Sequence, residues 1–247
     1  MTGRTVLVHP DADALAHAVA ARLITRIADA QAERGGASVV LTGGTVGIAV
    51  LAAVAASPAR TAVDWAAVEF WWGDERFLPE GDPERNETGA RSALLDHVPV
   101  DPARVHVMRG PDGPDGDDVE AAAARYAGEL RDAAGEGEVP AFDVMLLGMG
   151  PDAHINSLFP GLPAVHEEKL TVVAVHGSPK PPPTRISLTV PAVRSAREVW
   201  VVAAGEGKAE AVRLGITGAP AAEAPVATAL GRERTLFLLD RPAASRL

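Results

Sequence analysis

The stretch Ala37-Ser38-Val39-Val40-Leu41-Thr42-Gly43-Gly44-Thr45 joins five mostly apolar residues to a pair of glycines. A short, β-branched apolar run is typical of a strand that is buried on both faces. The alanine-rich stretch Val46–Ala55 follows directly and has the composition of a helix. A strand, a tight glycine turn and a helix form the repeating unit of a parallel sheet.

The same alternation continues on both sides of this stretch. Because strands that alternate with helices favour parallel pairing, we predict an α/β fold with a mostly parallel twisted sheet and helices on both faces. The further predicted strands are Thr5–Val8, Val68–Trp72, Phe142–Leu147, Thr171–Val175, Glu198–Ala203 and Arg234–Leu239, and the further predicted helices are Asp11–Ala32, Arg85–Leu95, Glu120–Arg131 and Gly207–Leu214.

Length and composition limit the classes of protein that fit. The 247 residues, 47% of them hydrophobic, are enough for a large core, and we expect a single domain over residues 1–247. The formal charge of −10 opposes general binding to nucleic acid or to an anionic membrane. The absence of cysteine excludes disulfides, thiol nucleophiles and thiolate metal sites. The segment Met1–Thr5 leads into an apolar run too brief for a signal peptide, so a cytoplasmic location is expected.

Two segments rich in glycine, proline and acidic residues interrupt the alternation. Gly110–Asp118 and Gly135–Pro140 are interpreted as solvated connectors. The alternative for the first is a site for a hard cation, because clustered carboxylates can bind one.

Five predicted junctions after strands are polar and rich in glycine. In open α/β sheets, ligands bind outside the carboxyl ends of the strands, so parallel strands would gather these loops at one edge. The five junctions are Leu41–Thr45, Trp72–Arg76, Leu147–His154, Val175–Lys180 and Ala204–Lys208.

The glycines of the first junction indicate an anion site. Gly43 and Gly44 let backbone N–H groups approach an anion at a helix N-terminus, which suits a phosphate. The alternative is an ordinary tight turn with Thr45 as the N-cap of the helix. Nearby cations favour the phosphate, although each of them alone would be an ordinary surface residue; they are Arg76, Lys180, Arg185 and Lys208.

The segment Gly148–Gly161 contains the best candidate for catalysis. His154 lies on a glycine-opened turn after a strong strand, two residues beyond Asp152. A neutral imidazole there can act as a general base, with the carboxylate orienting it or contacting substrate. The structural alternative is that the His154 ring caps a helix beginning near Ile155.

Three other kinds of site fit the residues less well. Gly148–Ala153 matches a loose dinucleotide fingerprint, but Pro151 follows its second glycine and no acidic residue ends a strand about 20 positions on. The chain has no His-Glu-x-x-His element for zinc and no Gly-x-Ser-x-Gly elbow for a serine nucleophile.

As a set, these motifs resemble the 6-phosphogluconolactonases, within the superfamily that includes glucosamine-6-phosphate deaminase. The resemblance covers nearly the whole chain and rests on Leu41–Thr45, Trp72–Pro79, Asn86 with Ala90-Arg91, Phe142–Gly161, Ser178–Pro182 and Gly205–Ala209. It implies a Rossmann-like fold of the NagB/RpiA type, no cofactor and no metal. It also implies hydrolysis of 6-phospho-D-glucono-1,5-lactone to 6-phosphogluconate in the oxidative pentose phosphate pathway.

By the resemblance, the catalytic residues fall on His154 and Asp152. The substrate and phosphate contacts fall on Gly43, Gly44, Thr45, Arg76, Lys180, Arg185 and Lys208. The expected partner is a small sugar-phosphate lactone, bound by a monomer or weak homodimer, with no nucleic acid or membrane.

The chain departs from the lactonase pattern at two places and differs from the deaminases at a third. Thr45-Val46-Gly47 replaces the usual Ser-Thr-Pro, and Ala153 stands where glycine is usual, at an expected cost of roughly 1 kcal/mol if that position needs a positive φ. Ser157–Gly161 replaces the Asn-Glu-Pro-Gly of the deaminases, which favours the lactonase. The remaining alternatives are an amino-sugar-phosphate deaminase or isomerase and a non-catalytic sugar-phosphate sensor.

Overall fold

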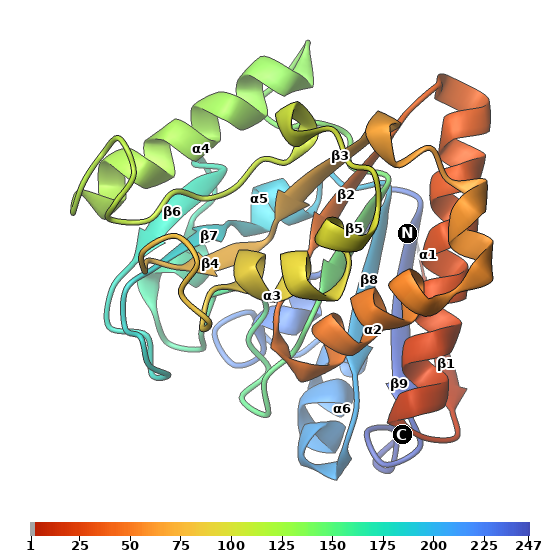
Figure 1. The fold of residues 1–247 in the computed structure, drawn as a ribbon. Helices are drawn as coiled ribbons and strands as arrows, with labels where there is room; N and C mark the ends of the chain where they lie inside the picture. Colours follow the sequence, from red (N-terminus) through yellow and green to blue (C-terminus); the bar gives the residue numbers. More distant parts are fainter. Residues whose placement is uncertain (1–2) are drawn as a thin grey trace.

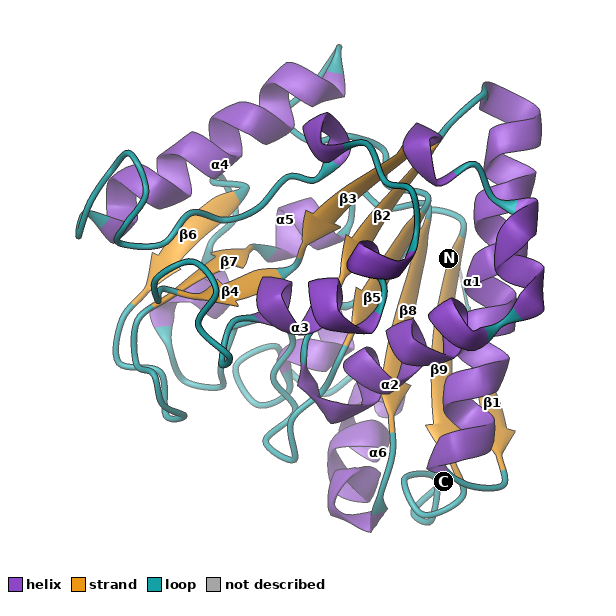
Figure 2. Cartoon of the chain, in the orientation of Figure 1, coloured by secondary structure: helices purple, strands orange, loops and turns teal. Residues whose placement is uncertain are grey.

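A six-stranded parallel sheet forms the centre of the molecule (Figures 1 and 2). The computed structural model describes residues 3–247, so Met1 and Thr2 of the segment judged too brief for a signal peptide lie outside it. The strand order is β1-β9-β8-β5-β2-β3, and every neighbouring pair is parallel. The strands are β1 (Arg4–His9), β2 (Ala37–Leu41), β3 (Val68–Trp72), β5 (Val144–Leu147), β8 (Glu198–Ala203) and β9 (Arg234–Asp240).

A second, antiparallel sheet of three strands was not predicted from the sequence. Its order is β4 (Asp74–Arg76), β7 (Arg185–Leu188) and β6 (Val172–Val175). The predicted strand Thr171–Val175 therefore exists, but it lies outside the parallel sheet. Gly73 connects the two sheets, because its N–H donates to Leu41 O at 3.1 Å while its carbonyl accepts from Leu188 N at 2.8 Å.

The predicted helices are confirmed, with ends that differ by a few residues. The first begins after Asp11, whose carboxylate accepts from Ala14 N at 2.8 Å, and ends at Gly35, whose φ of 76° is unfavourable for other residues. Helices α1 to α3 cover one face of the large sheet, and α4 lies on the small sheet (Figure 1). The helices are α1 (Ala12–Arg34), α2 (Gly44–Ala56), α3 (Asn86–Ala93), α4 (Val119–Ala134), α5 (Val190–Val193) and α6 (Ala209–Thr217).

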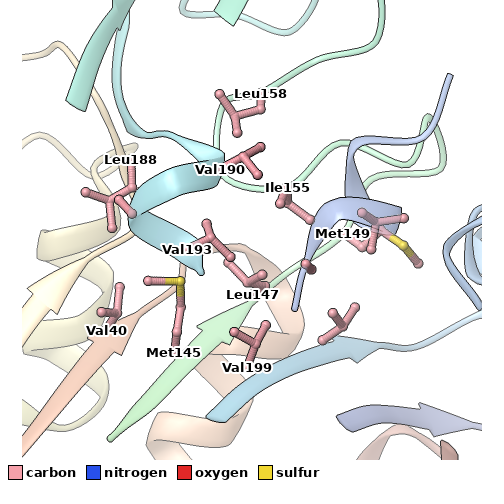
Figure 3. Close-up of a cluster of buried hydrophobic side chains, with 14 of the residues drawn as sticks. Val40, Met145, Leu147, Met149, Ile155, Leu158, Leu188, Val190, Val193 and Val199 are labelled. Carbon is pink, nitrogen blue, oxygen red and sulfur yellow. The ribbon is translucent and has the colours of Figure 1, made fainter. Parts of the chain in front are cut away.

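Side chains of the large sheet alternate between two hydrophobic cores. Val144 and Leu146 of β5 face the core under α1 and α2, while Met145 and Leu147 face the core that includes α5 and α6. Figure 3 shows the second core, where Met145 and Leu147 lie near Val193 of α5. Each such buried side chain stabilises the fold by about 1.5–3 kcal/mol, which explains why near-continuous apolar runs form these strands.

The two strands at the middle of the sheet connect in opposite directions. From β2 the chain crosses to β3 on one side, and from β5 it continues to β8 on the other. Such a switch point opens a crevice at the carboxyl ends of the strands. The loops after β2 and β5 meet there, where Gly148 N donates to Thr42 Oγ1 at 3.1 Å.

The acidic connector 110–118 consists of turns and has structural contacts. Asp118 caps α4 by accepting from Ala121 N at 3.0 Å, and Asp115 pairs with Arg125 at 2.7 Å. Within residues 3–247, no group of three His, Cys, Asp or Glu side chains is placed to hold a metal ion. No helix in that range is long and apolar enough to cross a membrane.

Candidate active site

A chamber of about 400 Å³ opens at the crevice between the loops that follow β2 and β5. Cations line it although the chain is acidic overall, so the chamber suits an anionic ligand. Its walls include His154 together with every residue to which the resemblance assigned phosphate or substrate contacts, namely Gly43, Gly44, Thr45, Arg76, Lys180, Arg185 and Lys208.

His154 and Asp152 form a close pair at the wall of this chamber. His154 Nδ1 lies 2.5 Å from Asp152 Oδ1, and Lys180 Nζ lies 3.4 Å from Asp152 Oδ2. Partial burial raises the pKa of Asp152, but the hydrogen bond to His154 and the charges of His154 and Lys180 outweigh it and hold the pKa well below its usual range. Asp152 is therefore an ionised hydrogen-bond acceptor at neutral pH.

An ionised Asp152 determines which nitrogen of His154 carries the proton. The carboxylate accepts from Nδ1–H, which leaves the lone pair of Nε2 free. Lys180 Nζ also lies 3.3 Å from Nδ1, but two donors cannot share a hydrogen bond, so the ammonium group pairs with Asp152 instead. The arrangement leaves His154 with a basic nitrogen and an oriented ring.

The ring of Phe159 packs against His154 and lies near Lys180. The buried ring lies 4.5 Å from the His154 ring, with an interplanar angle of 33°, and Lys180 Nζ lies 5.9 Å from its centroid.

The alternative that the His154 ring caps a helix is wrong, because no helix begins near Ile155. Ile155 and Leu158 instead form an isolated bridge within turns.

A tight turn at Gly150 makes the pair possible. Ala153 N donates to Gly150 O at 3.0 Å, which brings the ends of the turn together. A Cβ atom on Gly150 would lie well inside 3.0 Å of both Asp152 Oδ1 and the His154 ring. The glycine therefore leaves the space that the two side chains occupy.

Ala153 has a positive φ of 62°, and its methyl group is buried. Relief of the left-handed strain would stabilise an Ala153→Gly variant by about 1–2 kcal/mol. Loss of the buried methyl and the greater freedom of the unfolded chain would cost about as much. We therefore expect the free energy of unfolding in urea to change by less than about 1 kcal/mol. A loss well above that would show that the methyl contact outweighs the strain.

The N-terminus of α2 forms another wall of the chamber. The helix begins at Gly44, and its N-cap is Gly43, which makes no side-chain cap. The alternative that Thr45 caps the helix is therefore wrong. Because the first N–H groups of a helix have no partner within the helix, those at Gly44 and Thr45 are suited to an anion. Asn86 packs so closely on Gly43 that a Cβ at Gly43 would collide with its Oδ1.

The four predicted cations differ in how free they are. Arg185 is buried and donates to the carbonyls of Lys180, Pro181 and Pro182 at 3.0–3.1 Å, and burial lowers its pKa against the opposing charge of Asp74. Arg185 therefore organises the loop that carries Lys180 as well as bordering the chamber.

Lys208 is the least constrained of these cations. Partial burial and the charge of Lys180 lower its pKa, against the opposing effect of Asp152. Two ammonium groups that repel each other across a chamber would both be stabilised by an anion between them.

Four further polar residues line the chamber, although none was assigned a role from the sequence: Thr42, Asp74, Asn86 and Asn156. Asp74 is buried; it accepts from Ser157 Oγ at 2.7 Å and from Asn86 Nδ2 at 3.2 Å, and Arg185 Nη1 lies 4.0 Å away. Asn156 is 7% exposed, and its Oδ1 has no hydrogen-bond partner within the described part of the chain. This oxygen packs on the backbone of Gly73, because a Cβ atom there would collide with it.

Glu75 fixes the position of the chamber wall that contains Arg76 and Asn86. It accepts from the backbone N–H groups of Arg76, Asn86 and Glu87 at 2.7–2.8 Å and so caps α3. Burial raises its pKa to about 7, although Arg85 and these three N–H groups oppose the shift.

Glu75 predicts a specific pH dependence of stability. An acid with a raised pKa in the folded state contributes stability that is fully present below its unfolded pKa, near 4.5, and is lost as pH rises through about 7. Between pH 5 and 8 this loss amounts to up to roughly 3 kcal/mol. Urea unfolding across that range should show a flatter profile for Glu75→Gln than for the unchanged protein. Parallel profiles for the two proteins would contradict the raised pKa of Glu75.

Comparisons with known proteins show the family to which the chain belongs. The profile of the family described as Glucosamine-6-phosphate isomerases/6-phosphogluconolactonase matches residues 10–237. A 6-phosphogluconolactonase of Streptomyces coelicolor is 62% identical over 98% of this chain and 94% of its own length. One from Mycobacterium tuberculosis is 50% identical over 98% of both chains.

A solved structure gives the same result for the fold. The 6-phosphogluconolactonase from Trypanosoma brucei superposes with a TM-score of 0.82 at 30% identity, covering 100% of both chains. The resemblance noted in the sequence and the predicted α/β class are thereby confirmed. The chain belongs to the family of glucosamine-6-phosphate isomerases and 6-phosphogluconolactonases.

Proposed function

We propose that the chain is a 6-phosphogluconolactonase, which hydrolyses 6-phospho-D-glucono-1,5-lactone to 6-phospho-D-gluconate in the oxidative pentose phosphate pathway. The observation that carries this proposal is the oriented pair of His154 and Asp152 at a chamber lined with cations. Relatives with this name, at 50% and 62% identity over nearly the whole chain, support the choice of substrate.

The phosphate of the substrate is held at the N-terminus of α2. Backbone N–H groups of Gly44 and Thr45 donate to its oxygens, and Lys208 and Arg76 supply positive charge. The sugar ring then extends toward His154, along the part of the chamber lined by Asn156 and Lys180.

His154 acts as the general base. Its Nε2 takes a proton from a water molecule while the water oxygen bonds to the lactone carbonyl carbon. Asp152, which accepts from Nδ1–H, stabilises the imidazolium ion that results. A backbone N–H of the loop that follows β5 stabilises the negative charge that develops on the carbonyl oxygen.

Collapse of the tetrahedral intermediate breaks the bond between the carbonyl carbon and the ring oxygen. The imidazolium of His154 returns its proton to that oxygen, which leaves as a hydroxyl group. The product is the open-chain acid, and His154 is again neutral. None of these steps needs a metal or a cofactor.

The direct test is hydrolysis of freshly generated 6-phosphogluconolactone, followed by acid release and compared with the unphosphorylated lactone. We expect the phosphorylated lactone to be strongly preferred. Ammonia release from glucosamine 6-phosphate, without lactone hydrolysis, would support the deaminase instead. Binding of both sugar phosphates without turnover would support a sensor.

Removal of Lys208 should weaken binding through the phosphate. We expect Lys208→Ala to raise KM for the phosphorylated lactone by about 10-fold or more, because a charge-assisted hydrogen bond contributes about 1.5–3 kcal/mol. Turnover of the unphosphorylated lactone should change little. An equal loss with both substrates would place Lys208 at the reacting carbonyl and not at the phosphate.

We also propose that the enzyme acts in the cytoplasm as a monomer or weak homodimer. Every residue used in the mechanism comes from one copy of the chain, so the site needs no second copy. Light scattering over a range of concentrations would test the oligomeric state.

A further inference from the structure

A second chamber, of about 310 Å³, lies on the other side of the loop that follows β2. It shares Gly43, Gly44, Thr45 and Lys208 with the catalytic chamber, and Gly148 and Met149 form part of the wall between them. The two chambers therefore meet at the proposed phosphate site. We call the second one the apolar chamber.

The walls that belong only to the apolar chamber are small aliphatic side chains. They come from the starts of α1 and α2 and the end of β8, and are Ala12, Val46, Ala49, Val202, Ala203 and Ala204. Lys208 is the only charged residue among those described that line it. Neither His154 nor Asn156 borders it, so this chamber offers no catalytic group, and its polar groups are confined to the end at Thr45 and Lys208.

The chamber is large enough for a ring. A cavity of about 150 Å³ lined by apolar side chains can hold benzene, and this one is about twice that volume. Open apolar walls beside N–H groups and an ammonium group together favour a ligand with one anionic end and one apolar end. The hydroxyl groups of a free sugar would face the aliphatic walls, where no side chain can hydrogen-bond them.

We propose that the apolar chamber binds phosphate monoesters that carry a flat apolar group, such as aryl phosphates. The phosphate occupies the same position as that of the lactone, and the apolar group extends away from His154 instead of toward it. This inference rests on the proposed function only for the position of the phosphate. Because both ligands need that position, such esters compete with the substrate and are not turned over.

The test compares phenyl phosphate with inorganic phosphate by titration calorimetry and by inhibition of lactone hydrolysis. We expect phenyl phosphate to bind roughly tenfold more tightly, because burial of the ring adds to binding at about 25 cal/mol per Å² minus the cost of fixing the ligand. Inhibition should be competitive with the lactone. Equal affinities for the two compounds would overturn the proposal.

Two substitutions locate the ring. Ala49→Leu, on the exposed wall of α2, should fill the chamber and remove the tenfold advantage of phenyl phosphate while leaving KM for the lactone unchanged. Ala52→Leu, on the same helix and exposed but bordering neither chamber, is the matched control and should keep the advantage.

Ala12→Leu, on α1, repeats the test if the α2 variant folds poorly. An advantage that survives in both Ala49→Leu and Ala12→Leu would place the ring in the catalytic chamber and overturn the proposal. Calorimetry detects binding without turnover. A protein that binds phenyl phosphate as expected but does not hydrolyse the lactone would therefore contradict the proposed function alone.

Discussion

Replacement of His154 by alanine should lower kcat for the phosphorylated lactone by about 10²–10⁴-fold, the usual contribution of a general base. The loss follows from the geometry, because His154 lines the chamber and Asp152 holds its Nδ1, which leaves Nε2 as the basic nitrogen. KM should change little, since the proposed phosphate contacts are untouched. Initial rates corrected for spontaneous hydrolysis are the appropriate measurement.

A second histidine provides the control. His176 lies on another loop, exposed and 3.0 Å from Glu120, so His176→Ala makes the same change away from the pair. We expect it to keep normal turnover. Both variants should unfold at similar urea concentrations, because neither imidazole is a large part of the core. Near-normal kcat in His154→Ala would refute the mechanism.

Gly150→Ala should be nearly as damaging, although it removes no functional group. The added Cβ would occupy the space where Asp152 Oδ1 and the His154 ring meet, so the pair must separate. A displacement of about 1 Å in a catalytic group can cost about 10²-fold in rate. We therefore expect kcat to fall by about 10²-fold or more, with KM largely retained.

The matched control for Gly150 is Gly207, in the loop that precedes Lys208. A Cβ there would meet no heavy atom within 4 Å, and its φ lies outside the positive range. Gly207→Ala should therefore keep both kcat and KM. If Gly150→Ala also remains active, the close pairing of Asp152 and His154 is not needed for turnover.

The parallel sheet was predictable because its signal is local. Each strand from β2 to β9 in the large sheet is buried on both faces and so has a continuous apolar run, as in Val39-Val40-Leu41. The first residue of each helix was less well predicted. The helix α2, for example, begins at Gly44 without a side-chain cap, two residues before the predicted start at Val46.

The small sheet could not be predicted from its own residues. Its strand β4 is Asp74-Glu75-Arg76, which has no apolar alternation and lies only one residue after β3. Asp74 and Glu75 are buried because tertiary partners satisfy them: Asp74 accepts from Ser157 Oγ, and Glu75 caps α3. Long-range pairing of this kind leaves no periodic pattern in the sequence.

The same reasoning applies to the candidate site. The placement of His154 and of the cations around one chamber followed from their positions after strands. The positions of Asp74 and Asn156 depend on contacts between distant segments, and Asn156 also adopts an unusual φ of 49°. Such residues are recognised only when the chain is folded.

The division of the site between two sheets also affects how activity is lost under stress. His154 and Gly44 are attached to the six-stranded sheet, whereas Arg76 and Lys180 belong to the three-stranded one. Regions with fewer buried apolar contacts open by local unfolding at lower free energy than a central core does, and we expect the three-stranded sheet to be such a region. Mild denaturant should therefore inactivate the enzyme while its helices remain intact, and amide hydrogens in β6 and β7 should exchange before those in β5 and β8.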